Sequence, residues 1–150
     1  GSEMCIRDRP KIIQRGHGYN QGGEHDIAPT LTSNSYHENN VLKITEATSQ
    51  GYAEAEVGDS VNLSHPNSKT RRGRVGKKIA NTLLTGESQG MVEPDFRIRK
   101  LTPRECWRLQ GFPDWAFDKA QKVNSNSQLY KQAGNSVTVS VIAAIAKELE

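Results

Sequence analysis

The most regular hydrophobic pattern of the chain lies at its C-terminal end. Apolar residues recur there at every fourth position, with further apolar residues beside them; the recurring ones are Val137, Val141, Ile145 and Leu149. This spacing is typical of one face of an amphipathic helix, since a helical turn takes about 3.6 residues. We predict a helix that begins at Asn135 and Ser136. The chain offers no evident partner for its apolar face, which indicates that part of the core lies elsewhere.

A helix-start signal precedes this pattern at Thr102, Pro103 and Glu105. Threonine suits the N-cap, proline suits the first turn, and the glutamate can accept a hydrogen bond from the cap amide. Gly111 and Pro113 are predicted to end this helix. The signal therefore predicts a short helix with its own cap.

A second signal pairs Ser125 with Gln128 and predicts a short helix through Tyr130. Gly134 is predicted to close that helix in a left-handed conformation. Two aromatic residues between the helices are predicted to pack in the core; they are Trp115 and Phe117.

Shorter, strand-like patterns occur before residue 102. Lys11–Gln14, residues 60–63 and residues 96–101 cluster or alternate apolar positions as short strands do. Residues 48–57 show weak helical character instead. The many glycines between residues 15 and 25 make regular structure unexpected there, so we predict a surface loop.

One short segment occurs twice. Residues 27–32 read IAPTLT and residues 79–84 read IANTLL, each after a polar, turn-rich stretch. Two copies are too few for a solenoid. The similarity is either chance or the sign of two β-like units of one type, and the second interpretation predicts a small pseudo-repeated β subdomain.

Composition indicates a chain without a large core of its own. Only 34% of the residues are hydrophobic and the mean hydropathy is −0.72, whereas globular domains are nearer to half apolar. No apolar run approaches the ~20 residues of a membrane span and no secretory pattern is present, so we expect a cytoplasmic protein with no membrane partner. Cys5 and Cys106 are expected to be reduced thiols, with a disulfide as the alternative. The four scattered histidines favour solvated loop positions over a metal site.

Charge is distributed unevenly along the chain. Residues 1–68 contain 5 Lys+Arg and 9 Asp+Glu, whereas residues 69–150 contain 15 and 8. Residues 69–78 (KTRRGRVGKK) hold six cations and no acid. This basic loop is either a solvated segment or a DNA contact, in which Gly73 and Gly76 let the backbone approach DNA and arginines match phosphate and guanine.

Three motifs resemble those of a known family. RKLTPRECWRLQGFPD, followed by QLYKQAGNSVTVSVIAAIAKEL, closely resembles the last two motif blocks of the bacterial and phage DNA (cytosine-5) methyltransferases. The match covers roughly the final third of the chain. GRVGKKIANTL is similar, over a shorter stretch, to part of that family's target-recognition region.

The resemblance implies an α+β architecture. Residues 11–96 would form a loop-rich, mostly β recognition region that reads duplex DNA. Residues 97–150 would form helices that pack on a doubly wound α/β methyltransferase domain absent from this chain, and residues 1–10 a tail or cloning remnant. Enzymes of the family flip a cytosine out of the duplex and attack C6 with a cysteine thiolate. They then transfer a methyl group from S-adenosylmethionine to C5.

The resemblance also assigns roles by position. Asn135 and Ser136 fall where the family borders the S-adenosylmethionine pocket, although an exposed helix cap is the alternative. Arg104 and Glu105 match the block that holds the two domains together, a role compatible with a local cap and salt bridge. Residues 30–31 either read DNA or pack a strand. The implied DNA contacts are Arg71, Arg72, Arg74, Lys77, Lys78, Thr82 and Leu83.

The chain also departs from the family. The donor-binding Phe-x-Gly-x-Gly, the Pro-Cys nucleophile loop and the Glu-Asn-Val block do not occur in the 150 residues. Cys106 lies in a predicted helix and not after a proline, so no catalytic residue is assigned. We expect the C-terminal portion of a methyltransferase, inactive alone, whose partners are duplex DNA and a catalytic half from the same gene or a separate subunit. The alternatives are a non-enzymatic DNA-binding module, the recognition subunit of a two-chain methyltransferase, and a degraded remnant.

Overall fold

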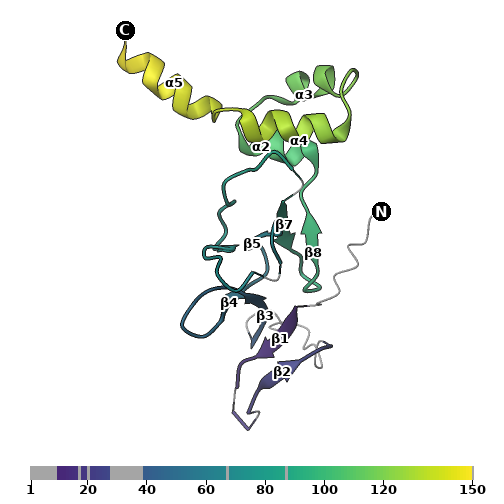
Figure 1. Cartoon of the computed structure of the whole chain (residues 1–150), viewed down its shortest axis with the longest axis vertical. Helices are drawn as coiled ribbons and strands as arrows, with labels where there is room; N and C mark the ends of the chain where they lie inside the picture. Colours follow the sequence, from purple (N-terminus) through teal and green to yellow (C-terminus); the bar gives the residue numbers. More distant parts are fainter. Residues whose placement is uncertain are drawn as a thin grey trace.

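The computed structural model describes residues 10–16, 18–19, 21–27, 39–66, 68–86 and 88–149. The predictions for the tail before residue 10, for Cys5, His17 and His37, and for residues 30–31 lie outside the described residues. Two small antiparallel sheets and a group of helices follow one another along an elongated molecule (Figure 1). The structure is thus α+β.

The first sheet has the strand order β2-β1-β3-β4 and is antiparallel throughout. Its strands are β1 (Lys11–Gln14), β2 (Gly23–His25), β3 (Asn40–Thr45) and β4 (Tyr52–Ala55). The strand predicted at Lys11–Gln14 is confirmed. The loop predicted for residues 15–25 is wrong at β2, and the weak helix predicted for residues 48–57 is wrong at β4. Both strands are determined by pairing with a neighbouring strand, which overrides weak local preferences.

The second sheet has the order β6-β5-β7-β8 and is also antiparallel throughout. Its strands are β5 (Ser60–Asn62), β6 (Val75–Gly76), β7 (Gln89–Val92) and β8 (Ile98–Lys100). The strands predicted in residues 60–63 and 96–101 are confirmed as β5 and β8.

The two sheets have the same connectivity. In each, the first strand in sequence lies between the second and the third, and the fourth strand pairs with the third. The two similar sequence segments begin at equivalent places, because Ile27 follows β2 and Ile79 follows β6. Of the first segment the structure describes only Ile27. The repeated topology agrees with two β units of one type.

One hydrophobic core joins both sheets. The first sheet contributes Ile12, Leu42, Ile44 and Ala55, and the second contributes Val61 and Val92, with Phe96 from the turn before β8. Since these side chains form a single cluster, the sheets are not independent domains. Burial of the apolar surface between them stabilises the pair as one unit.

Residues 101–149, all of which the structure describes, form four helices: α2 (Pro103–Leu109), α3 (Asp114–Ala120), α4 (Asn126–Asn135) and α5 (Val139–Glu148). The predicted capping box of α2 is confirmed, and Gly111 follows the helix with a φ of 83°. The predicted serine cap is also confirmed, because the Ser125 side chain accepts a hydrogen bond from the Gln128 amide.

Two details of the helical region differ from the prediction. Gly134 does not close α4 in a left-handed conformation, because the helix continues through Asn135; α5 then begins at Val139. Of the two aromatic residues, Phe117 is buried, whereas Trp115 is 64% exposed. For Gly134, the sequence alone does not distinguish a glycine that ends a helix from a glycine inside one, and tertiary packing decides between the two.

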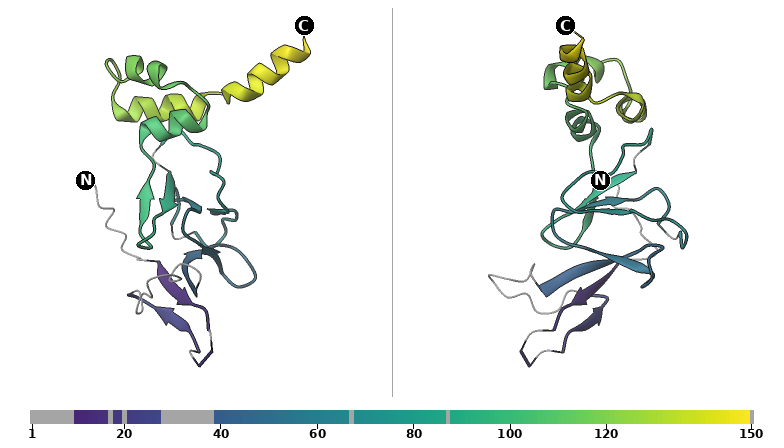
Figure 2. Two further views of the ribbon diagram at one scale, coloured as in Figure 1. Left: turned by 180° about the vertical axis from the view of Figure 1, so that it is seen from behind. Right: turned by 90° about the vertical axis from the view of Figure 1, so that its left-hand side faces the viewer.

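The helix α5 projects from the other elements. Figures 1 and 2 show it standing away from α2, α3 and α4, and none of its residues is buried. Its start is attached to α2, because the Val139 amide donates a hydrogen bond to the Gln110 carbonyl at 2.8 Å. Within the described ranges, no helix combines the length and the apolar character needed to cross a bilayer.

Candidate nucleic-acid interface

The basic loop (residues 69–78) comprises the end of the connection from β5, the short strand β6 and the two lysines after it, and it contains both exposed and buried cations. Lys69, Arg72 and Lys78 are exposed and form no ion pair with a described acidic residue. Arg71 is half-buried and contacts the His65 ring. Lys77 is exposed at its stem, but its ammonium group is bonded to the protein. The loop therefore presents part of its charge to solvent and uses the rest internally.

Arg74 does not fit the prediction that it contacts DNA. Its side chain is only 4% exposed. The guanidinium donates to the carbonyl oxygens of Asn62 at 3.2 Å, Thr45 at 2.6 Å and Pro66 at 2.9 Å. Burial lowers the pKa of Arg74, while attraction to Glu46 acts in the opposite direction. The sequence could not distinguish this arginine from its neighbours, because the carbonyls that bind it come from distant segments.

Two buried carboxylates hold the backbone of the basic loop. Glu46 accepts hydrogen bonds from the amides of Gly73 at 2.7 Å and Arg74 at 3.1 Å. Asp59 is fully buried and accepts from the Lys78 amide at 3.1 Å and the Lys77 ammonium at 2.9 Å. Buried carboxylates are stable only when such donors compensate for the loss of water. Sequence reasoning missed both acids, since each is a single residue at a strand end with no motif around it.

The segment with the predicted recognition dipeptide, residues 79–85, follows the basic loop. Its beginning is attached to the second sheet, because the Ser60 hydroxyl donates to the Ile79 carbonyl at 2.6 Å. Thr82 is exposed, and its carbonyl accepts a hydrogen bond from the buried Gln89 amide at 3.1 Å. Leu83 is half-buried and packs against Cys106, Tyr130 and Ala133. The two residues predicted to act together thus point to different surroundings.

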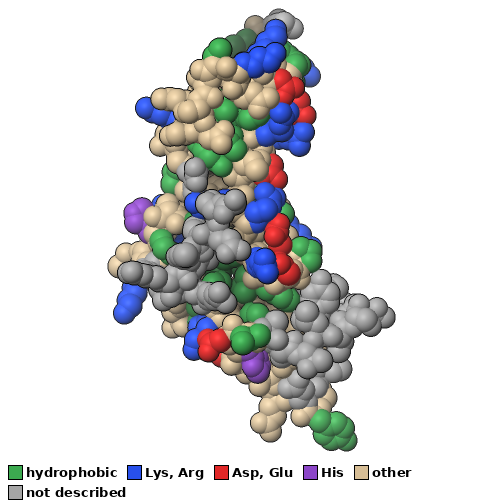
Figure 3. All heavy atoms as spheres, turned by 90° about the vertical axis from the view of Figure 1, so that its right-hand side faces the viewer, with side chains coloured by type: hydrophobic (Ala, Val, Ile, Leu, Met, Phe, Trp, Pro, Cys, Tyr) green, Lys and Arg blue, Asp and Glu red, His purple; other side chains and the backbone are tan. Residues whose placement is uncertain are grey.

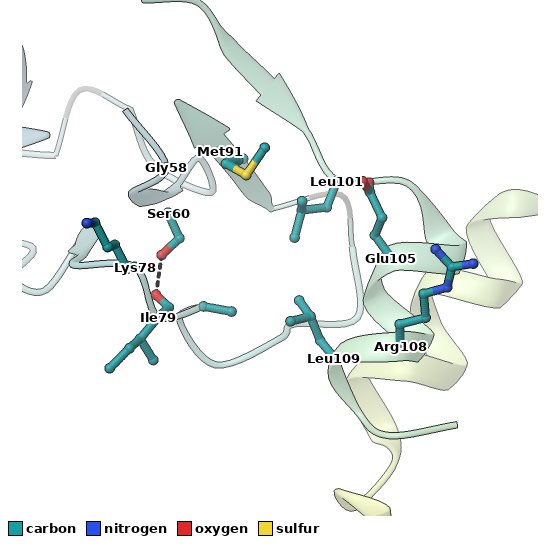
Figure 4. A pocket seen from close by; sticks show the side chains of 11 residues that line it. Gly58, Ser60, Lys78, Ile79, Met91, Leu101, Glu105, Arg108 and Leu109 are labelled. Atoms are coloured by element: carbon teal, nitrogen blue, oxygen red, sulfur yellow. Dashed lines mark hydrogen bonds between the residues drawn. The ribbon is translucent and has the colours of Figure 1, made fainter. Parts of the chain in front are cut away.

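An open pocket lies between this segment and α2. Its volume is about 370 Å³. Figure 4 shows Lys78 and Ile79 on one side, Met91 and Leu101 on another, and Leu109 and Arg108 projecting from α2. The lining is mainly apolar, with charged groups from Lys78, Glu105 and Arg108.

Arg104 and Glu105 are held in ion pairs with partners on neighbouring elements. Glu105 binds Arg99 of β8 through two hydrogen bonds of 3.0 and 2.9 Å and accepts a third from the Thr102 amide at 2.7 Å. The hydrogen bond from Arg99 is the main reason that the pKa of Glu105 is lowered to about 2. Arg104 binds Asp118 of α3 at 2.6 Å and stacks over the Phe117 ring.

These contacts connect β8 to α2 and α2 to α3. On the face shown in Figure 3, basic and acidic side chains lie beside one another along much of one edge. Such paired charges do not form a continuous cationic surface. Arg104 and Glu105 thus have partners within this chain, and their predicted role between two domains stays a prediction.

Asn135 and Ser136 lie at the end of α4. Asn135 is exposed, and its side-chain amide makes no hydrogen bond to another described residue. The Ser136 hydroxyl donates to the Ala133 carbonyl at 2.8 Å. The exposed side-chain amide of Asn135 could therefore form hydrogen bonds with a polar ligand, whereas the hydroxyl of Ser136 already donates to a local carbonyl.

Cys106 has the properties of a core residue. It is buried in the helical cluster, and burial, assisted by the nearby Glu105 charge, raises its pKa to about 11. A thiol of this kind remains protonated at neutral pH and is a poor nucleophile. Among the residues that the structure describes, no three His, Cys, Asp or Glu side chains gather as a metal site would require.

Comparison with known proteins provides the family. The orphan methyltransferase M.SPBetaI of Bacillus phage SPbeta is 63% identical over 83 residues, which are 53% of this chain and 19% of that protein. M.Rho11sI of Bacillus phage rho11s is 53% identical over 83 residues, covering 53% of this chain and 16% of the relative. The DNA-cytosine methyltransferase of Escherichia coli K12 is 46% identical over 70 residues, 45% of this chain and 15% of the relative.

The matched part thus spans less than a fifth of each of these relatives. No solved structure matches the chain. The family model for C-5 cytosine-specific DNA methylase matches residues 9–150, almost the whole chain. The chain therefore belongs to the C-5 cytosine-specific DNA methylase family.

Proposed function

We propose that this chain reads duplex DNA and completes the catalytic domain of a DNA (cytosine-5) methyltransferase in the bacterial or phage-infected cytoplasm. The family match over residues 9–150 supports this function. S-adenosylmethionine, when bound to the complete enzyme, supplies the methyl group. The Asn135 amide would border its site, because that amide is exposed and makes no hydrogen bond to a described residue.

The observation that carries the proposal is the apolar surface of α5. Val141, Ile142 and Ile145 are each half exposed, at 50%, 52% and 52%. An isolated helix of this length is marginal in water, and most helices gain stability by packing an apolar face. The surface of a catalytic half of the family's α/β type would cover this face.

The basic loop supports the DNA-reading part of the proposal. Lys69, Arg72 and Lys78 are exposed without acidic partners among the described residues, while Glu46 and Asp59 hold the backbone beneath them. Cations held in this way can bind phosphates at a lower entropic cost than a free tail. Arg74 would support these contacts from inside and would not touch DNA.

Methyl transfer in this family requires a cysteine nucleophile, and Cys106, the cysteine that the structure describes, is not suited to that role. Cys106 is buried with a raised pKa and lies in the helical core. We infer that the chain alone does not transfer methyl groups and that the cysteine thiolate comes from the catalytic half. That half is encoded either by the same gene or by a separate one.

To test the proposal, a hybrid protein is made in which this chain is fused to the catalytic half of the Bacillus phage SPbeta relative. The transfer of radiolabelled methyl groups to duplex DNA is then measured for the hybrid and for the chain alone. Activity is expected for the hybrid and not for the chain alone. The double substitution Ile142→Asp and Ile145→Asp should abolish the methyltransferase activity of the hybrid, because it places charges on the apolar face of α5 that would contact the catalytic half. Ser140→Asp, which adds a charge elsewhere on α5, is the matched control and should remain active. Activity of the isolated chain would overturn the proposal.

A second candidate is a DNA-binding module that acts without catalysis, as a separate protein or as the recognition subunit of a two-chain enzyme. The single core shared by the two sheets favours it, because that core does not depend on α5. This candidate predicts cooperative unfolding and salt-dependent duplex binding by the chain alone. No methyl transfer by the hybrid, together with tight DNA binding by the chain, would favour it over the first proposal.

A further inference from the structure

Residues 79–85 run from the second sheet to the helices before the chain returns to β7, as the teal segment in Figure 1 shows. This segment contains the exposed Thr82 and the half-buried Leu83. Its first residue is attached to the sheet through Ser60. Its last residues lie instead against α4, so the segment bridges the two halves of the molecule.

The contact with α4 is made at Gly134. A Cβ atom placed on this glycine would lie 2.4 Å from the Leu84 carbonyl oxygen, 2.5 Å from the Leu84 carbonyl carbon and 2.7 Å from the Thr85 nitrogen. Non-bonded carbon atoms normally pack at about 3.5–4.0 Å. All three atoms belong to backbone, so no change of side-chain rotamer could make room for a larger residue.

The glycine is not explained by the helix itself. Gly134 lies inside α4, where its φ is not in the left-handed region. Glycine in a helix interior costs roughly 0.5–1 kcal/mol relative to alanine. The absence of a side chain instead lets the backbone of residues 84–85 lie directly on the helix.

Two further contacts fix the same segment. The buried Gln89 side chain donates to the Thr82 carbonyl, and the Leu83 side chain packs against Cys106, Tyr130 and Ala133. Together with the close packing of residues 84–85 on Gly134, these contacts hold the segment so that Thr82 is exposed and Leu83 packs inward. The next residue after Gly134 is Asn135, so these contacts adjoin the end of α4.

We propose that Gly134 is a positioning residue for DNA reading. By admitting the backbone of residues 84–85, it sets the orientation of Thr82 and of the segment between Ile79 and Thr85 relative to α4. This inference rests on the proposed function, in which the exposed cations of the basic loop bind phosphates. It adds that residues 79–85, which contain the predicted recognition dipeptide Thr82-Leu83, read bases. It assigns sequence discrimination, and not overall affinity, to the contact.

The experiment uses the full chain and its own preferred duplex, selected from random-sequence DNA. Fluorescence anisotropy gives the Kd for the selected duplex and for a scrambled duplex of equal length at several salt concentrations. Gly134→Ala should reduce discrimination between the duplexes by about tenfold or more, the scale of one specific base contact. Affinity for the scrambled duplex and its salt dependence should not change, because Glu46 and Asp59, and not Gly134, hold the backbone of the basic loop.

The matched control is Gly86→Ala. Gly86 lies just beyond the segment, and a Cβ there would meet no atom within 4 Å, so this variant should bind as the original chain does. Equal discrimination by Gly134→Ala and the original chain would overturn the inference. An equal loss of affinity for both duplexes would also overturn it, because it would indicate a general structural role.

Amide hydrogen exchange provides a readout that does not need DNA. Gly134→Ala should speed exchange in residues 79–85, while amides of β3 and β7 keep their protection. Unchanged exchange in that segment would contradict the positioning role even if no duplex were bound. Failure of the original chain to bind any duplex would instead contradict the proposed function.

Discussion

The two sheets have the same strand order but different charge on their surfaces. In the first sheet, Arg15 pairs with Glu54 and Glu56, and Lys43 pairs with Glu24. In the second sheet, the basic loop on either side of β6 carries exposed cations without acidic partners among the described residues. One topology can therefore carry either a neutralised surface or one suited to a polyanion, depending on the side chains of its connections.

The largest effect on stability is expected at Arg74, which belongs to the basic loop but is buried and does not contribute to its exposed charge. Arg74→Ala should destabilise the fold by on the order of 3 kcal/mol, since it leaves several buried carbonyls without a donor. Urea denaturation measures this loss. Arg72→Ala is the matched control and should change stability by no more than about 0.5 kcal/mol, because Arg72 is exposed. Equal effects of the two substitutions would contradict the distinction between internal and external arginines.

The next largest effect is expected at Glu46, which supports the second sheet's basic loop from the end of β3. Glu46→Gln should cost about 1–3 kcal/mol, because one of its two acceptor oxygens becomes an NH₂ group facing an amide donor. It should also weaken DNA binding through a less ordered loop. Glu54→Gln on the first sheet removes only an exposed ion pair and should be nearly neutral. Similar unfolding curves for the two variants would refute the anchoring role.

A third prediction concerns only the exposed cations. Replacing Arg72 and Lys78 together with alanine should lower the slope of log affinity against log salt by about 2, roughly one for each phosphate that the chain no longer neutralises. Stability should change little. The corresponding change on the first sheet, Lys11 with Lys43, should leave the slope unaltered, because both lysines lie near Glu24. Binding titrations at several salt concentrations decide between the two sheets.

The last prediction concerns the pH dependence at Glu105, where the second sheet meets the helices. Its pKa is about 2 in the folded chain and near 4.5 in the unfolded chain. The folded state therefore gains stability from this carboxylate above pH 4.5 and loses it as the pH falls toward 2. Glu105→Gln should flatten this part of the stability profile, whereas Glu148→Gln on α5 should not. Parallel denaturation profiles for the original chain and Glu105→Gln would exclude the pairing with Arg99.

The local features of this chain were predictable from its sequence. The caps at Thr102 and Ser125 depend on residues three positions away, and the strand at Lys11–Gln14 depends on a short apolar cluster. The apolar stripe of α5 and its lack of a partner were also visible in the residue pattern. Such features are determined by contacts between near neighbours, which sequence order alone specifies.

Only the tertiary structure decided the features that join distant segments. Strand pairing produced β4 where residues 48–57 alone favoured a weak helix. Arg74 is buried because its guanidinium donates to carbonyls from three segments, and the backbone of residues 84–85 lies so close to Gly134 that a Cβ atom there would not fit. Burial and close approach depend on what the chain places opposite a residue. For that reason, Arg72 and Arg74 lie two positions apart in one basic loop, but Arg72 is exposed and Arg74 is buried.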